Sequence, residues 1–253
     1  MILINQIKEF DSISLAELTN YSLMNRVDTK FFFSKEYLEN ILKSLHFDYR
    51  MLNTNKNRFV EYSSLYFDTD DNKMYLDHHN ERINRYKIRF REYLDSNLTF
   101  LEVKLKNNKG RTQKKRIKVK KCSYKFNEKE NEFISQHLPK NFGSINSVLW
   151  IYFKRLTMVH KKNKERLTID FDLEVYNDNK KIKLNNLCIA ELKQEKHSFK
   201  SDFFRVMKIN KLRSNRISKY CIGMNLLNNK LKYNKFKHKL LTINKIQNGN
   251  IWQ

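Results

Sequence analysis

The sequence contains few of the residues that interrupt or cross-link a chain. It has four glycines and one proline, Pro139, in 253 residues, which excludes collagen-like, linker-rich and low-complexity proteins. The three cysteines, Cys122, Cys188 and Cys221, are odd in number and widely scattered. The sequence therefore predicts neither a disulfide framework nor a zinc site, and free thiols fit a reducing compartment.

Long apolar segments are missing as well. No uncharged apolar run approaches the roughly 20 residues that a membrane helix needs, and the N-terminus lacks the apolar core of a signal peptide. We therefore expect a cytoplasmic protein, whose basic C-terminal tail leaves peripheral contact with a membrane open. Hydrophobic residues still make up 40% of the chain and aromatic residues 13%, which is enough to build a core.

Negative charge is scarce. The chain has 51 Lys and Arg against 27 Asp and Glu, a formal net charge of +24. Such an excess points to an anionic partner, which could be nucleic acid, an anionic membrane or a phosphate-rich small molecule. Part of the excess also fits a composition rich in Asn, Lys and Ile, which is typical of an AT-rich genome.

The clearest pattern in the sequence is a strict alternation over residues 85–93, RYKIRFREY. A period of two predicts a strand with one charged and one apolar face. The charged face would carry four cations: Arg85, Lys87, Arg89 and Arg91. Because like charges on one strand face repel, we expect an anion against them. The alternative is a solvated strand face, and it applies most to Arg85 and Lys87.

Four other segments repeat this alternation of charged and apolar residues, namely 26–30, 100–106, 166–172 and 190–193. We expect these segments to share one sheet with 85–93, whose polar side is either outer surface or the lining of a closed barrel. On the polar face of 166–172, Asp170 and Asp172 accompany Arg166 and could pair with it or bind metal.

The remaining segments complete an α+β architecture. Further strands are predicted over 59–68, 111–120 and 150–160, and helices over 35–45, 127–138, 201–209 and 219–227. No internal repeat or linker divides the chain. We therefore predict one antiparallel β-barrel domain with flanking helices over residues 1–228. A basic tail over 229–253 is expected to be loosely attached or surface-bound.

The order of short motifs resembles a known family. The motifs are NRVDTKF (25–31), SLYFDT (64–69), RYKIRFREY (85–93), LEVKLK (101–106), YFKR (152–155), RLTID (166–170), ELK (191–193) and SKYC (218–221). Together they look like the VTC polyphosphate polymerase domain, which belongs to the triphosphate tunnel metalloenzyme, or CYTH-like, superfamily. The resemblance covers about Tyr21 to Leu227. Each motif alone is weak, but eight in this order are hard to obtain by chance.

The resemblance implies an antiparallel barrel around a tunnel in which Lys and Arg hold a nucleoside triphosphate and carboxylates hold Mg²⁺ or Mn²⁺. The positions that fall on the family's phosphate-binding residues are Lys30, Arg89, Arg91, Lys104, Arg155, Arg166 and Lys219, and its metal-binding glutamate falls on Glu191. The alternation adds Arg85 and Lys193 for substrate binding. Glu102 is a second metal candidate, which could instead pair with a neighbouring lysine.

Within this set we assign the central cations to catalysis and the others to substrate binding. The catalytic candidates are Arg89, Arg91, Lys104, Arg155 and Arg166, and the substrate-binding candidates are Lys30, Arg85, Lys193 and Lys219. Arg forks bind phosphate through two N–H groups, whereas Lys is a movable point charge. Phosphoryl transfer needs such positioning and charge neutralisation more than covalent chemistry.

The resemblance thus implies an ATP-dependent polyphosphate polymerase that moves the γ-phosphoryl group of ATP onto a growing chain. Two alternatives stay open: a triphosphate or polyphosphate hydrolase of the same fold, and a non-catalytic polyphosphate- or nucleic-acid-binding module. A strongly basic chain binds nucleic acid at low salt whatever its role, but no motif predicts a specific nucleic acid. The expected partners are ATP, inorganic polyphosphate and, for export of the product, a membrane protein.

Overall fold

The computed structural model describes residues 6–21, 26–54, 57–109, 111–140 and 142–249. The strands of the described chain are β1 (Asp11–Ile13), β2 (Val27–Ser34), β3 (Tyr49–Leu52), β4 (Val60–Thr69), β5 (Arg85–Tyr93), β6 (Leu98–Lys106), β7 (Thr112–Val119), β8 (Ile145–His160), β9 (Glu165–Tyr176), β10 (Lys181–Leu184) and β11 (Leu187–Gln194). Each long strand matches a segment of alternating or apolar sequence, so the period of two was a sound guide here.

Short helices connect and cover these strands. They are α2 (Leu15–Leu18), η1 (Thr19–Tyr21), η2 (Lys35–Tyr37), α3 (Leu38–Leu45), α4 (Lys73–His79), α5 (Glu128–Ser135), α6 (Asp202–Ile209), α7 (Lys219–Leu227), η3 (Asn234–Phe236) and α8 (Lys237–Gln247). Ser34 caps the first turn of the η2–α3 segment, and Asn127 forms a capping box with Glu130 at α5. No helix within the described ranges has the length and apolarity needed to cross a bilayer.

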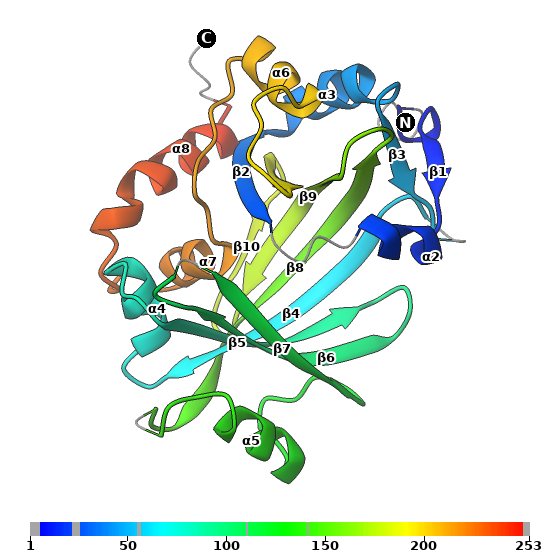
Figure 1. Ribbon diagram of the computed structural model, residues 1–253. Helices are drawn as coiled ribbons and strands as arrows, with labels where there is room; N and C mark the ends of the chain where they lie inside the picture. Colours follow the sequence, from blue (N-terminus) through cyan, green and yellow to red (C-terminus); the bar gives the residue numbers. More distant parts are fainter. Residues whose placement is uncertain (1–5, 22–25, 55–56, 110, 141, 250–253) are drawn as a thin grey trace.

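The strands form one large twisted sheet (Figure 1). Its main path runs β2–β11–β9–β8–β4–β5–β6–β7, and every pair along the path is antiparallel. Strands β5, β6 and β7 follow one another as the predicted three-strand meander. The predicted α+β architecture of antiparallel sheet and flanking helices is therefore confirmed.

The prediction of a closed barrel is wrong. β2 and β7 end the path, and within the described residues they do not pair with each other. β7 explains why the sheet stays open, because every residue from Thr112 to Arg116 is exposed and three of these five side chains are cations. Charged side chains on an edge strand oppose the addition of a further strand.

The core divides into clusters on the two faces of the sheet. On the outer face, α3 and α6 pack over β2, β9 and β11 through residues such as Leu42 and Phe203, and α5 packs over β5 and β6 through Phe133 and Ile134. The inner face carries a third cluster, to which α4, α7 and α8 contribute. The charged residues described below share this inner face, so α7 lies beside them.

The C-terminal segment, for which we expected a loosely attached or a surface-bound tail, packs against the inner face of the sheet. After α7 the chain forms η3 and α8, and the side chains of Phe236, Ile243 and Ile246 are buried in the inner cluster. Three apolar side chains among many lysines gave a weak signal in the sequence, but they suffice to hold a helix of this length against the sheet.

Candidate functional site

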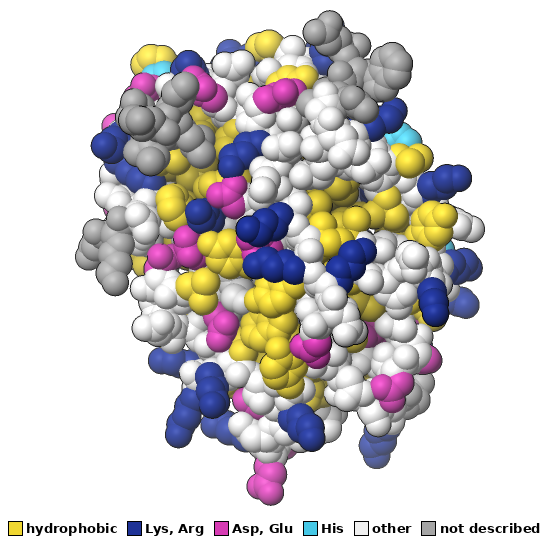
Figure 2. All heavy atoms as spheres, turned by 180° about the vertical axis from the view of Figure 1, so that it is seen from behind, with side chains coloured by type: hydrophobic (Ala, Val, Ile, Leu, Met, Phe, Trp, Pro, Cys, Tyr) yellow, Lys and Arg dark blue, Asp and Glu magenta, His cyan; other side chains and the backbone are white. Residues whose placement is uncertain are grey.

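The inner face of the sheet gathers charged side chains from neighbouring strands. Directly opposed residues of antiparallel strands point to the same face, and the register places Arg89 opposite Glu102 and Glu102 opposite Arg116. At the other end of the sheet, Glu191 lies opposite both Lys30 and Thr168. Figure 2 shows the molecule from behind, where cationic and anionic side chains lie around an apolar strip.

Glu102 is the centre of the cluster on β5, β6 and β7. Its side chain is fully buried, and Arg89 donates to Oε2 from Nε at 2.8 Å and from Nη2 at 2.6 Å. Lys114 reaches Oε1 at 3.3 Å. Burial alone would raise the pKa of Glu102, but the charges of Arg89, Arg91 and Lys104 hold it well below its ordinary value. Glu102 is therefore ionised and serves as a counter-ion for these cations.

Arg91 and Lys104 are less well neutralised than Arg89. Arg91 Nε is buried without a hydrogen bond and lies 4.0 Å from Glu102 Oε2. Lys104 makes no ion pair or hydrogen bond with the part of the chain that the structure describes. Burial, followed by the charge of Arg89, lowers the pKa of both groups. An anion placed between Arg91 and Lys104 would remove this electrostatic cost.

Asp170 is the counter-ion of a second cluster, on β8, β9 and α7. Arg155 donates to it from Nε at 2.5 Å and from Nη2 at 2.8 Å, and Lys219 of α7 also binds it. Burial would raise the pKa of Asp170, but Arg155 and Lys219 lower it to about 2. Burial also lowers the pKa of Lys219 to about 8, against the opposing effect of Asp170.

A third cluster lies at the β2 edge of the sheet. Lys30 and Lys193 each bind one oxygen of Glu191, and Lys193 also lies 3.6 Å from Asp28. Arg166 lies directly opposite Lys193 in the register. The Nε of Arg166 is buried without a hydrogen-bond partner. Burial, then the charges of Arg26 and Arg155, lower its pKa. Arg166 is thus the counterpart of Arg91 on the opposite side of the face.

Aromatic rings lie on the inner face of the sheet between the clusters and contact their cations. The guanidinium carbons of Arg91 and Arg155 lie 5.3 and 5.2 Å from the centre of the Tyr62 ring, and Lys219 Nζ lies 4.5 Å from that of Phe153. Tyr62 and Phe153 stack at 5.2 Å. Ring faces attract cations, and more strongly where water is excluded. The alternation of charged and apolar residues did not predict this role for Tyr62.

The N-terminus of α7 brings Lys219 to the sheet. Ser218 caps the helix and accepts a hydrogen bond from Lys87 Nζ at 2.8 Å, while the hydroxyl of Tyr220 donates to the fully buried Asp68. Gly223 permits close packing, because a Cβ there would lie 2.8 Å from Leu149 Cδ1. These contacts fix Lys219 beside Asp170.

Most of the residues predicted for the site gather on this face in the three clusters. Arg85 lies apart, since its Nη1 donates to the carbonyl of Arg82 at 3.1 Å. Asp172 is not on the face of Arg166 as predicted, because it pairs with Lys35 and Lys154 instead. Its φ of 50° and the register shift in β8 between Tyr152 and Lys154 break the period of two.

Sequence reasoning missed one further member of the clusters, Lys114, which contacts Glu102. Lys87, which the alternation placed on the charged face but which was left out of the predicted site, links β5 to α7. A signal for Lys114 was present, because Lys114, Arg116 and Lys118 alternate in the predicted strand 111–120 just as the cations of 85–93 do.

The two predicted metal ligands differ in their surroundings. Both oxygens of Glu102 face Arg89 and Lys114, which favours the ion-pair interpretation. Glu191 is held by two lysines, whose ammonium groups can turn toward a phosphate and leave the carboxylate for a cation. Among the described residues no three His, Cys, Asp or Glu side chains gather as a metal site. Mg²⁺ needs only one or two carboxylates when substrate phosphates supply other ligands, so Glu191 fits such an ion.

The low pKa of Lys219 predicts a pH dependence of anion binding. Above pH 8 the free protein loses the Lys219 proton, so the affinity for tripolyphosphate should fall as the pH rises from about 8 to about 10. Calorimetric titration across this range measures the effect. Lys219→Arg should flatten it, because arginine stays charged. An equal fall in the arginine variant would contradict the assignment.

Comparison with known proteins gives a family and several distant structures. Residues 25–228 match the family model described as the VTC domain. A conserved hypothetical protein from Pyrococcus furiosus shares 16% identity over 75% of this chain and 92% of its own, with a TM-score of 0.43. The PH1012 protein from Pyrococcus horikoshii shares 9% over 74% and 88%, with a TM-score of 0.39.

A third solved structure is that of a putative adenylyl cyclase, HpAC1, from Hippeastrum, which is described as having a dominant triphosphatase activity. It shares 10% identity over 82% of this chain and 96% of its own, with a TM-score of 0.43. The search of curated proteins gave no match.

Proposed function

The chain belongs to the VTC domain family, and we propose that it is an ATP-dependent polyphosphate polymerase acting on the inner face of its sheet. The observation that carries this proposal is the pair Arg91 and Arg166, two partly buried side chains whose Nε atoms are buried and have no hydrogen-bond partner. A buried donor without a hydrogen bond is costly, and a chain of phosphates is an anion long enough to contact both groups.

In this proposal, different cations bind the phosphates from different sides. Arg91, Lys104 and Arg89 hold the phosphates on the β5–β6 side, while Arg155, Arg166 and Lys219 hold them on the β8–β9 side. Fixed donors on both sides align the terminal phosphate of the growing chain with the γ-phosphoryl group of ATP. They also stabilise the charge that spreads over the transferred group. Lys30 and Lys193 bind the adjoining phosphates.

A divalent cation would be held by Glu191 together with phosphate oxygens. When bound, Mg²⁺ or Mn²⁺ supplies charge neutralisation at the phosphates that separate. Before substrate binds, Lys30 and Lys193 keep Glu191 ionised, since their charges hold its pKa well below the ordinary value against the effect of burial.

The carboxylates favour a polymerase over a hydrolase. Nearby cations hold the pKa values of Glu102, Asp170 and Glu191 below their ordinary values, so all three are weak proton acceptors. Activation of water calls for a base with a pKa near the working pH. A terminal phosphate is already ionised and needs no such base.

Product analysis tests this proposal. The full chain is incubated with ATP and Mn²⁺, and phosphate chains, ADP and free phosphate are measured over time. We expect ADP and long phosphate chains to accumulate together. Free phosphate as the sole phosphorus product besides ADP would identify a hydrolase, and the absence of turnover would identify a binding module. Arg91→Leu serves as the inactive control.

A further inference from the structure

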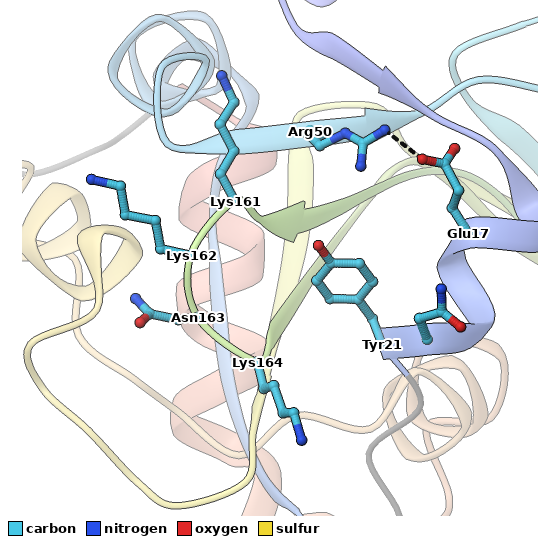
Figure 3. Close-up of a pocket in the computed structure, with 8 residues that line it drawn as sticks. Glu17, Tyr21, Arg50, Lys161, Lys162, Asn163 and Lys164 are labelled. Carbon is cyan, nitrogen blue, oxygen red and sulfur yellow. Dashed lines mark hydrogen bonds and ion pairs between the residues drawn. The ribbon is translucent and has the colours of Figure 1, made fainter.

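A separate basic pocket lies at the end of the β8–β9 hairpin (Figure 3). Its volume is about 340 Å³, and its lining residues are Glu17, Asn20, Tyr21, Arg50, Lys161, Lys162, Asn163 and Lys164. Four of these side chains are cationic and one is anionic. Figure 3 shows the three lysines along the hairpin and Arg50 across from them, joined to Glu17. The pocket therefore has the charge that an anion requires.

The pocket continues the inner face of the sheet. Arg50 of β3 lies opposite Val159 of β8, and Val159 lies opposite Arg166 of β9. Directly opposed residues point to the same face, so Arg50 and Arg166 share it with one strand between them. Two strand spacings separate their Cα atoms by about 10 Å. Arg166, with its partnerless Nε, thus lies between the central clusters and the pocket.

Two of the four cations of the pocket are held by carboxylates, since Lys161 Nζ lies 2.5 Å from Asp11 and Arg50 Nη2 lies 2.8 Å from Glu17, so Lys162 and Lys164 are the two that an anion can reach. Lys164 pairs with Glu195 at 3.5 Å, and these side chains are 71% and 56% exposed. Lys162 is exposed and makes no ion pair with any described residue. Arg50 differs, because it also donates two hydrogen bonds to the carbonyl of Ser12. Exposed ion pairs contribute little to stability, so a phosphate chain can replace the Lys164 contact at low cost.

We propose that this pocket is a second anion subsite, which binds the distal part of a polyphosphate chain whose reacting end lies in the central clusters. The inference rests on the proposed function and adds a substrate preference to it. A long chain reaches from Arg166 to Lys162 and Lys164, whereas tripolyphosphate occupies the central clusters alone. The pocket therefore selects for chain length and not for phosphate as such.

The test compares two ligands on the full chain. Lys162→Gln combined with Lys164→Gln removes two exposed charges without disturbing the core, and Lys125→Gln combined with Lys129→Gln is the matched control beside α5. Calorimetric titration uses tripolyphosphate and a long polyphosphate of narrow length distribution. We expect the pocket variant to bind the long chain about tenfold more weakly and tripolyphosphate as the wild type does.

Salt dependence gives a second measurement. Each phosphate contact of a single-stranded polyanion contributes about 0.7 to the slope of log K against log salt, so two lost contacts should reduce the slope by about 1.4 for the long chain. An unchanged affinity for the long chain, or an equal loss for both ligands, overturns the subsite alone. If the wild type binds neither ligand, the subsite and the proposed function fail together.

Discussion

Arg91→Leu should abolish function without destabilising the fold. The side chain of Arg91 is 12% exposed, its buried Nε lacks a hydrogen bond, and Oε2 of Glu102 lies 4.0 Å from that Nε. Its charge therefore costs free energy in the unliganded protein, and leucine removes that cost. We expect the affinity for tripolyphosphate to fall about 100-fold, corresponding to about 3 kcal/mol, because a buried charge partner of the ligand is lost. The midpoint of thermal unfolding should stay the same or rise.

Two variants make this result specific. Arg82→Leu removes an exposed guanidinium just before β5 and should bind tripolyphosphate as the wild type does. Arg89→Leu should bind weakly and unfold more easily, because it removes the two donors that bind Oε2 of the buried Glu102. Wild-type affinity in Arg91→Leu, or a loss of stability as large as that of Arg89→Leu, would contradict our account of Arg91.

Glu102→Gln should have the opposite effects: the fold should lose stability and the protein should bind the anion more tightly. Gln keeps the size of the side chain but removes the only carboxylate that contacts Arg89, Arg91 and Lys114 in the described structure. The free energy of unfolding should fall by about 3 kcal/mol, as it does when a buried charge network loses one partner, and the unfolding midpoint should fall by about 10 °C.

Tripolyphosphate should restore the stability that the Glu102→Gln variant loses. In Glu102→Gln the ligand becomes the main counter-ion, so its binding should be tighter than in the wild type and its stabilising effect larger. Differential scanning fluorimetry with and without tripolyphosphate measures both effects, with Glu132→Gln on the exposed side of α5 as the control. If the variant is as stable as the wild type and gains nothing more from the anion, Glu102 is not the counter-ion that we describe.

Alternation predicted β5 and β6 because apolar residues line one face of each strand and mostly charged residues line the other. It failed where the strand is short or bent. β1, β3 and β10 have three or four residues each, too few for a period to be recognised. At Asp172 a positive φ and a bulge opposite reverse the direction of the side chain, and no sequence period records such a change.

For the site, the sequence supplied the cations but not their partners. The resemblance identified Lys219 and Arg155, and alternation placed Asp170 on a charged strand face. That both cations share this one carboxylate follows from the docking of α7 on β8 and β9. Contacts between distant segments depend on the whole fold, and a local pattern carries no information about them. The closure of the barrel was mispredicted for the same reason.

The most direct test of our central claim is a crystal structure of the full chain with tripolyphosphate. We predict that the anion lies on the inner face of the sheet and contacts Arg91 and Lys104 from one side and Arg155 and Arg166 from the other. The Nε atoms of Arg91 and Arg166 should then both have partners. An anion bound elsewhere, with these two guanidinium groups unchanged, would contradict the claim.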